Sequence, residues 1–340
     1  MRKRLLRTVL AALGCAVLAA SPASAEKIRI AALTFVSSSP LFIAKERGYY
    51  EEEGLEAEIE FFRAAQPVAV AIASGDADFG VTAFTAGFFN LAAEGGLSVI
   101  GAQSREEKGY DFSAYLASNQ AFEAGLTSPD KLPGHSFAMT QHGSSFHLML
   151  GLLADKRGFA LDELRLVPLQ GVPNMIAALK SGQTDSAILP AHIAVPLADS
   201  GEARIIGWVA DETPYQLGGL FTSTRNVEER RDVVERFVRA YQKGARDYHA
   251  AMNARDASGQ RVFGPDAEAL IPIIGKYTGA SPEAIRAGAV FIDPEGRLDV
   301  GSVHDQLEWF RKEGLVDEGV KAESFMVLSF IDGHMNVPAK

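Results

Sequence analysis

Residues 40–55 read PLFIAKERGYYEEEGL, and residues 73–80 read ASGDADFG. In the first stretch a helical pattern is stopped by Gly48 and again by Gly54, and the chain then enters a β-rich run at Leu55. In the second, Gly75 ends a helix and a short β-rich run follows from Phe79. Glycine is the residue that most often closes a helix in a left-handed conformation. Both stretches therefore predict a helix followed at once by a strand.

The same alternation continues outward along the chain. Strands are predicted at 27–33, 55–62, 79–83 and 97–102, with helices at 39–48, 67–74 and 85–93 between them. A polar stretch at 123–133 interrupts this alternation, which then resumes. Strands are predicted at 136–140, 164–168, 185–189 and 203–209, and helices at 144–156, 172–180 and 190–198. Strands that alternate with helices are typical of mostly parallel sheets covered by helices. The sequence therefore predicts two α/β units in tandem.

The third part of the chain is predicted to be helical. Helical patterns cover 227–253, 266–278, 282–289, 300–313 and 322–330. A helical region of this size would not bury its apolar faces by itself, so we expect it to pack on an earlier unit.

The first 25 residues have the pattern of a secretory signal peptide. Arg2, Lys3, Arg4 and Arg7 precede an apolar run from Val9 to Ala20. Ala23-Ser24-Ala25 then supplies the small-x-small pattern of a cleavage site. The apolar run is shorter than the roughly 20 residues that a membrane-spanning helix needs. We therefore expect export to the periplasm, with cleavage after Ala25.

The single cysteine, Cys15, lies inside this apolar run. Lipid anchoring at Cys15 is an alternative, but the run continues past it to the better cleavage site. Cleavage after Ala25 would leave no cysteine for a disulfide or a zinc site. The chain has 33 basic and 43 acidic residues, and this acidic balance argues against nucleic-acid binding, which needs Lys and Arg to neutralise phosphates.

Four stretches of the chain resemble a known family. They are residues 40–55, residues 73–80, Gly143-Ser144-Ser145-Phe146-His147, and residues 177–185, AALKSGQTD; residues 306–314, QLEWFRKEG, are similar to its closing helix. The family is that of the substrate-binding proteins of ABC importers of the nitrate, sulfonate and taurine type, with the type II periplasmic-binding-protein fold. The resemblance covers nearly all of residues 26–340.

The resemblance implies an architecture and partners. Residues 26–115 and 212–340 would form lobe 1, with the helical C-terminal region packed on it, and residues 116–211 would form lobe 2. Each lobe would hold a mostly parallel sheet flanked by helices, with hinges near 111–118 and 211–223. The protein would be a monomer that binds a small-molecule ligand, uses no cofactor or metal, and meets an ABC permease and ATPase at the inner membrane.

Ligand-contacting residues are expected in the turns that follow the strands, because ligands of open α/β sheets lie beyond the carboxyl ends of the strands. The candidates are Thr34, Phe35, Ser37, Ser38 and Ser39 after the first strand; Thr82, Phe84 and Thr85 after the third; Thr140, Gln141, His142, Gly143, Ser144 and Ser145 in the second unit; and Leu189, Pro190 and Trp208 at later strand ends. Free amides at helix starts suit anionic or carbonyl groups. For the serines, simple helix capping is the alternative, and for Phe84 and Trp208 it is core packing.

The ligand is expected to be a small organic solute with a carboxylate, sulfonate or similar polar group, and its body could be aromatic. No cationic clamp is evident: Arg63 and Arg105 are expected at the solvated surface. His147 is expected to be structural.

An enzyme is not expected, because the chain has no His-Glu-x-x-His, no Gly-x-Ser-x-Gly and no phosphate-binding loop. Two alternatives remain open on the same fold: an enzyme similar to pyrimidine synthases, and a sensor that reports ligand to a membrane receptor.

Overall fold

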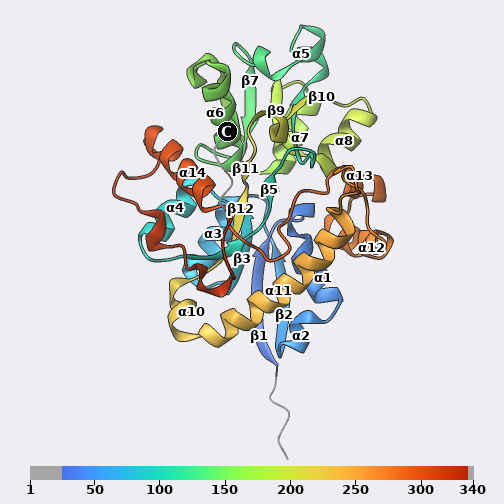
Figure 1. The fold of residues 1–340 in the computed structure, drawn as a ribbon. Helices are drawn as coiled ribbons and strands as arrows, with labels where there is room; N and C mark the ends of the chain where they lie inside the picture. The colour runs from blue at the N-terminus through green and yellow to red at the C-terminus, as the bar shows by residue number, and fades with distance from the viewer. Residues whose placement is uncertain (1–24, 336–340) are drawn as a thin grey trace, which may run out of the picture.

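A computed structural model describes residues 25–335 and contains two five-stranded sheets, one in each half of the molecule (Figure 1). The first sheet consists of β1 (Glu26–Ala32), β2 (Leu55–Phe61), β3 (Phe79–Ala83), β4 (Ser98–Ala102) and β12 (Gly218–Thr222), in the order β2-β1-β3-β12-β4. The second consists of β6 (Ser113–Ala117), β7 (Ser136–Met139), β8 (Arg165–Pro168), β9 (Ser186–Pro190) and β10 (Arg204–Trp208), in the order β10-β6-β9-β7-β8. The predicted two-lobed α/β fold is confirmed.

Each sheet is mostly parallel, with a single strand that runs the other way. In the first sheet β12 lies between β3 and β4 and is antiparallel to both. In the second sheet β6 lies between β9 and β10 and is antiparallel to both. These two strands are the ones that the sequence analysis did not predict as strands. Both belong to the stretches where the chain passes from one sheet to the other.

The two passages between the sheets also pair with each other. The short strands β5 (Arg105–Glu106) and β11 (Tyr215–Gln216) are antiparallel, with Glu106 opposite Tyr215. The chain then enters the second sheet at Ser113, so residues 113–115, which were predicted to belong to lobe 1, lie in the second sheet.

Helices cover both sheets. Those next to the first sheet are α1 (Ser39–Glu46), α2 (Tyr49–Glu52), α3 (Ala65–Ser74) and α4 (Ala86–Ala93); those next to the second are α5 (Asn119–Glu123), α6 (Ser145–Arg157), α7 (Val172–Lys180), α8 (Ala191–Asp199) and α9 (Val209–Glu212). The two glycines of the opening motif, Gly48 and Gly54, have the positive φ angles of 74° and 69° that the sequence predicts. They stop α1 and α2 and direct the chain into β2.

The C-terminal region is helical and packs mainly on the first lobe. It contains α10 (Thr224–Glu229), α11 (Arg231–Met252), α12 (Ala267–Thr278), α13 (Pro282–Ala287) and α14 (Val300–Lys312). In Figure 1 the long helix α11, in orange, crosses the lower lobe and lies against α1 and α2. Two helices also reach the second lobe, since α13 contacts α8 and α14 contacts α6.

Two helix predictions in this region were wrong. The helix predicted at 227–253 is broken at Arg230, where the backbone leaves the helical conformation and the guanidinium binds Asp78 and Glu26. The helix predicted at 322–330 is instead two short 3₁₀ turns, Ala322–Ser324 and Leu328–Phe330.

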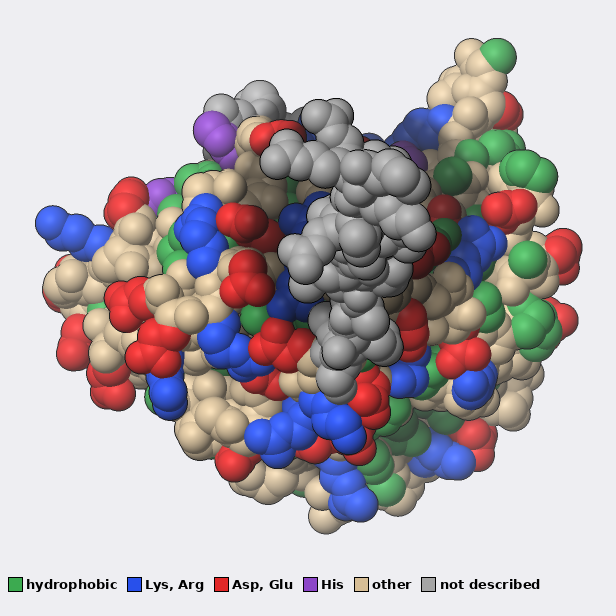
Figure 2. Space-filling model, turned by 90° about the horizontal axis from the view of Figure 1, so that it is seen from below, with side chains coloured by type: hydrophobic (Ala, Val, Ile, Leu, Met, Phe, Trp, Pro, Cys, Tyr) green, Lys and Arg blue, Asp and Glu red, His purple; other side chains and the backbone are tan. Residues whose placement is uncertain are grey.

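Ion pairs join α11, and Arg230 just before it, to the start of the first lobe. Arg230 and Arg236 both bind Glu26, and Lys243 binds Glu52 and Glu53. Figure 2 shows the same mixture of acidic and basic side chains over this lower face. The face therefore carries no large field of one sign.

Residues 1–24 of the predicted signal peptide, Cys15 included, lie outside the described residues. Among the helices of residues 25–335, none combines the length and the apolar character needed to cross a membrane.

Candidate functional site

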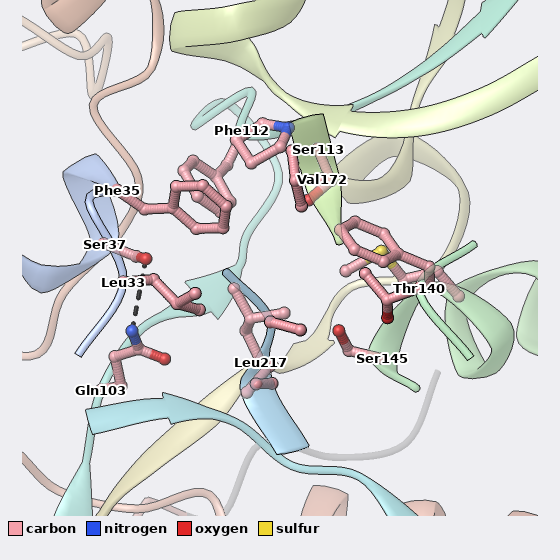
Figure 3. A pocket seen from close by; sticks show the side chains of 16 residues that line it. Leu33, Phe35, Ser37, Gln103, Phe112, Ser113, Thr140, Ser145, Val172 and Leu217 are labelled. Atoms are coloured by element: carbon pink, nitrogen blue, oxygen red, sulfur yellow. Dashed lines mark hydrogen bonds between the residues drawn. The ribbon is translucent and has the colours of Figure 1, made fainter. Parts of the chain in front are cut away.

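A pocket lies between the two sheets (Figure 3). Its walls come from both lobes and from the passages between them: Leu33, Phe35, Ser37, Ala64, Ala65, Ala83 and Gln103; Thr140, Ser145, Phe146, Met149, Val172 and Pro190; and Phe112, Ser113 and Leu217. Leu33, Gln103 and Thr140 directly follow β1, β4 and β7. The pocket therefore lies at the carboxyl ends of the strands, where open α/β sheets bind ligands.

The pocket walls are aromatic, aliphatic and neutral. Phe35 and Phe112 lie on one side of the pocket in Figure 3. Phe146 and Met149 also line it. None of the lining residues in the described part of the chain has an ionisable side chain. A ligand is thus surrounded by apolar surface and a few oriented polar groups, as in most small-molecule sites.

Four helical segments begin at the pocket. Ala65 is the first residue of α3, Ser145 of α6 and Val172 of α7, and Ser37 lies in the 3₁₀ turn Val36–Ser38 that leads into α1. The first N–H groups of a helix have no acceptor within it, and the helix dipole makes this end positive. Because these ends converge where no cationic side chain lies, they favour a ligand group rich in acceptor oxygens.

The polar side chains are neutral donors and acceptors. Gln103 Nε2 donates to Ser37 Oγ at 3.3 Å, the bond drawn in Figure 3. Gln103 Oε1 is buried and accepts no hydrogen bond from the described residues. Thr140 and Ser145 lie on the opposite wall. A buried acceptor without a partner is costly, so Gln103 offers a place for a donor group of a ligand.

A neutral histidine lies behind the aromatic wall. The His192 ring meets the edge of Phe35 at 5.4 Å between centroids and lies 6.4 Å from Phe112. Burial lowers the pKa of His192 to about 3. The wall therefore remains uncharged at neutral pH.

Five of the seventeen predicted contact residues line the pocket, namely Phe35, Ser37, Thr140, Ser145 and Pro190. The other twelve do not: Thr34, Ser38, Ser39, Thr82, Phe84, Thr85, Gln141, His142, Gly143, Ser144, Leu189 and Trp208. Phe84 and Leu189 are fully buried in the core. Trp208 is partly buried at the end of β10 and pairs with Ala114.

Several of these twelve residues shape the turns rather than the pocket. Thr85 Oγ1 accepts from Phe88 N at 3.0 Å and caps α4. Ser144 Oγ accepts from His147 N at 3.3 Å and caps α6. His147 Nδ1 in turn accepts from Gly143 N at 3.1 Å.

His147 has a structural environment, as expected. Its ring packs edge-on against Trp309 at 5.2 Å between centroids. Burial, with a smaller contribution from His142, lowers the pKa of His147 to about 4. The imidazole is therefore neutral, and its Nδ1 is occupied by the Gly143 amide.

Two backbone hydrogen bonds join the lobes at the rims of the pocket. Ala86 N, at the start of α4, donates to Gly143 O at 2.9 Å. Val172 N, at the start of α7, donates to Arg63 O at 3.4 Å. A Cβ atom on Gly143 would lie 2.8 Å from the Ala86 Cβ atom. These two bonds hold the lobes together beside the pocket.

The predicted environment of Arg105 was wrong, whereas that of Arg63 was correct. Arg105 is 3% exposed and binds Asp299 and Glu107. The Arg63 side chain is exposed, as expected. Neither residue lines the pocket with a positive charge.

Sequence reasoning missed eleven lining residues. Three of them, Phe112, Ser113 and Leu217, belong to the passages between the sheets, which carried no helix-to-strand signal. Gln103 follows β4 directly, so the strand-end rule applied to every strand would have found it. The same rule applied to β2 and β8 leads to Ala64, Ala65 and Val172.

A family profile described as "NMT1/THI5 like" matches residues 36–257. The chain belongs to the NMT1/THI5-like family. No curated protein sequence matches it.

Solved structures with this fold include binding proteins and an enzyme. The alkanesulfonate-binding protein SsuA of Xanthomonas axonopodis pv. citri, bound to MOPS, is 19% identical, with a TM-score of 0.73 over 90% of this chain and 100% of that one. The periplasmic nitrate-binding protein NrtA of Synechocystis PCC 6803 is 12% identical, with a TM-score of 0.67 over 88% and 83%. The desulfurization enzyme DSZB is 15% identical, with a TM-score of 0.61 over 90% and 97%. These likenesses confirm the periplasmic-binding-protein fold but do not separate binding from catalysis.

Proposed function

We propose that this protein is a periplasmic solute-binding protein that captures a small organic solute between its lobes and delivers it to an ABC importer. The observation that carries the proposal is the pocket itself: converging helix N-termini, apolar walls and neutral hydrogen-bonding groups, contributed by both lobes. The solute would place an acceptor-rich group, such as a carboxylate or sulfonate, at the helix ends and its apolar body against Phe35, Phe112 and Met149.

The proposal includes a motion of the lobes, divided near residues 115 and 212. Solute would enter an open form and be enclosed when the Ala86–Gly143 and Val172–Arg63 bonds form. Closure around a ligand is a common motion of two-lobed proteins. The closed form would then dock on a permease, with the ATPase on the other side of the inner membrane.

Binding is favoured over catalysis by the chemistry of the pocket. Its hydroxyls come from Ser37, Ser113, Thr140 and Ser145, and no carboxylate, imidazole or amine of the described residues lines the pocket beside them. Activation of a serine nucleophile needs a general base within hydrogen-bond reach. The buried Glu106 carboxyl lies against Ser113, so Ser113 is the first hydroxyl to change in a test for catalysis. The enzymatic alternative would gain support only from turnover by purified protein that is abolished by changing one of these hydroxyls.

The test is a thermal-shift screen of protein lacking residues 1–25. The panel should hold aliphatic and aromatic sulfonates and carboxylates, with nitrate and sulfate as inorganic comparisons. A solute at 100 times its Kd stabilises the folded state by about 2.7 kcal/mol, which gives a clear rise in Tm. Stabilisation by organic acids but not by inorganic ions is expected. If no solute raises Tm, or only inorganic ions do, the proposal fails.

Variants test whether the thermal shift arises from solute bound in the pocket. Ser145→Ala and Met149→Lys should weaken or abolish the thermal shift, the first by removing a hydroxyl and the second by burying a charge. Ser200→Ala removes an exposed hydroxyl at the end of α8 and should leave the shift unchanged.

A further inference from the structure

Buried polar atoms without a partner gather where the chain passes between the lobes. Those with no hydrogen bond to the described residues include Gln103 Oε1, Ser104 Oγ, Glu106 Oε1, Tyr115 OH, Thr213 Oγ1, Tyr215 OH and Gln306 Oε1. Native proteins leave few buried polar groups unpaired, and each one calls for an explanation. A cluster at the crossing strands indicates groups whose hydrogen bonds form with water or in another arrangement of the lobes.

Glu106 is the ionisable member of this cluster whose charge state matters near neutral pH. It lies in β5, opposite Tyr215 of β11, and is completely buried. Glu106 Oε2 accepts one long hydrogen bond, 3.4 Å, from Ser113 N, and Oε1 accepts none from the described residues. A carboxylate held by one long bond in the interior is poorly solvated.

The groups around Glu106 do not compensate a negative charge. Tyr215 faces it from β11, and Tyr115 and Ser113 face it from β6. Asp111, in the loop before β6, adds a like charge.

No Lys, Arg or His of the described residues forms an ion pair with Glu106. Its neighbour Arg105 binds Asp299 and Glu107 instead. Burial raises the pKa of Glu106 to about 7, hydrogen bonding from Ser113 opposes this rise, and Asp111 adds to it.

The position of Glu106 connects this charge to the pocket and to the hinge. Ser113, its hydrogen-bond donor, lines the pocket and pairs with Pro190 of β9, which also lines it. On the proposed motion of the lobes, opening would admit water to the cleft at Ser113 and let it solvate the carboxylate. Closing would return the carboxyl to the dry interior. The closed form would therefore favour the neutral acid, and the open form would tolerate the ionised one.

We propose that Glu106 is a positioning residue that couples closure of the lobes to the uptake of one proton. The closed arrangement holds the carboxyl in its neutral form, and ionisation shifts the lobes toward the open arrangement, where water can solvate the charge. The inference rests on the lobe motion of the proposed function. It adds that capture is tighter at acidic pH and release easier at alkaline pH.

The test measures the distance between the lobes without any solute. Nitroxide labels are attached to Val70→Cys on α3 and Ala177→Cys on α7, both exposed positions. The sequence outside residues 1–25 has no other cysteine, so labelling is specific. Distance distributions from double electron–electron resonance are recorded at pH 5.5 and pH 8.5.

The ratio of closed to open protein should fall as pH rises. If opening restores the ordinary pKa of 4.5, the fall between pH 5.5 and pH 8.5 reaches about 30-fold. Glu106→Gln keeps the shape but cannot ionise, so its distribution should be independent of pH. Glu94→Gln, an exposed change on the same lobe, should retain the full pH response.

Unchanged distances in the unsubstituted protein at the two pH values would overturn the inference. So would an equal pH response in the Glu106→Gln protein. Glu106→Leu provides a second non-ionisable variant in case the amide destabilises the hinge. Because no solute is used, solute binding can persist when this coupling fails, and the thermal-shift panel reports on it separately.

Discussion

Gly143→Ala should lower both the stability of the folded protein and its affinity for solute, and the two losses have different physical causes. Gly143 has φ of 76° in the turn before α6, and a Cβ there would lie 2.8 Å from the Ala86 Cβ atom across the pocket rim. The left-handed conformation costs a non-glycine residue about 1–2 kcal/mol whether the lobes are open or closed. On the proposed motion of the lobes, the contact with Ala86 would exist only in the closed form and would add to the cost of closure alone.

The expected loss of affinity follows from that second contribution. Pushing Ala86 away strains or breaks its hydrogen bond to Gly143 O, which is 2.9 Å long, and such a bond contributes about 1 kcal/mol. With a further overpacking cost of about 1 kcal/mol, the total of about 2 kcal/mol corresponds to roughly 30-fold weaker binding. Isothermal titration calorimetry with a solute from the thermal-shift panel measures this change, and thermal unfolding without solute measures stability.

Gly158→Ala is the matched control. Gly158 ends α6 with φ of 75°, and a Cβ there would meet no atom within 4 Å. It should lose about the same stability and no affinity. Adding Ala86→Gly to Gly143→Ala removes the colliding atom and should restore most of the affinity. Equal affinities of the Gly143→Ala and Gly158→Ala proteins would refute the closed-rim reasoning.

Three further changes test the energetics of the fold. Because the pKa of Glu106 is raised from 4.5 to about 7 in the closed, folded protein, its stability should fall by up to about 3 kcal/mol as pH rises from about 4.5 to about 7, and by less where the lobes open. Denaturant titrations of Glu106→Gln should lack this fall. Arg105→Met leaves Asp299 charged in the interior and should lower the free energy of unfolding by about 3–5 kcal/mol. The control is the exposed Arg63→Met, and equal unfolding midpoints for the two variants would contradict a stabilising buried ion pair. Ser144→Ala removes the cap of α6 and should cost about 1 kcal/mol in chemical unfolding, and a change below 0.3 kcal/mol would show that the cap is dispensable.

The order of helices and strands was predictable because its signals are local. Gly48 and Gly54 close helices through their own backbone conformation, and Ser144 caps α6 through a bond to a residue three positions away. The strand-end rule then led to Phe35, Ser37, Thr140, Ser145 and Pro190 on the pocket wall. These residues were accessible to sequence reasoning because each lies next to the strand that places it.

Other features depend on partners that are far away in the sequence. β6 and β12 each insert antiparallel between two strands of a sheet, so they depend on strands that are distant in the sequence. Phe112, Ser113 and Leu217 lie in or beside these strands and line the pocket. The sequence alone predicts Arg105 at the surface. In the structure it is buried against Asp299, which lies almost two hundred residues later in the chain.

The sequence by itself thus determined the two α/β units, the helix starts and the turns that face the cleft, since capping and periodicity act over a few residues. Only the tertiary structure decided which turn residues reach the pocket, that its wall is uncharged, and that Glu106 is buried in β5 between the two sheets. Burial and long-range strand pairing are properties of the assembled lobes, and they set both the neutrality of the pocket wall and the raised pKa of Glu106.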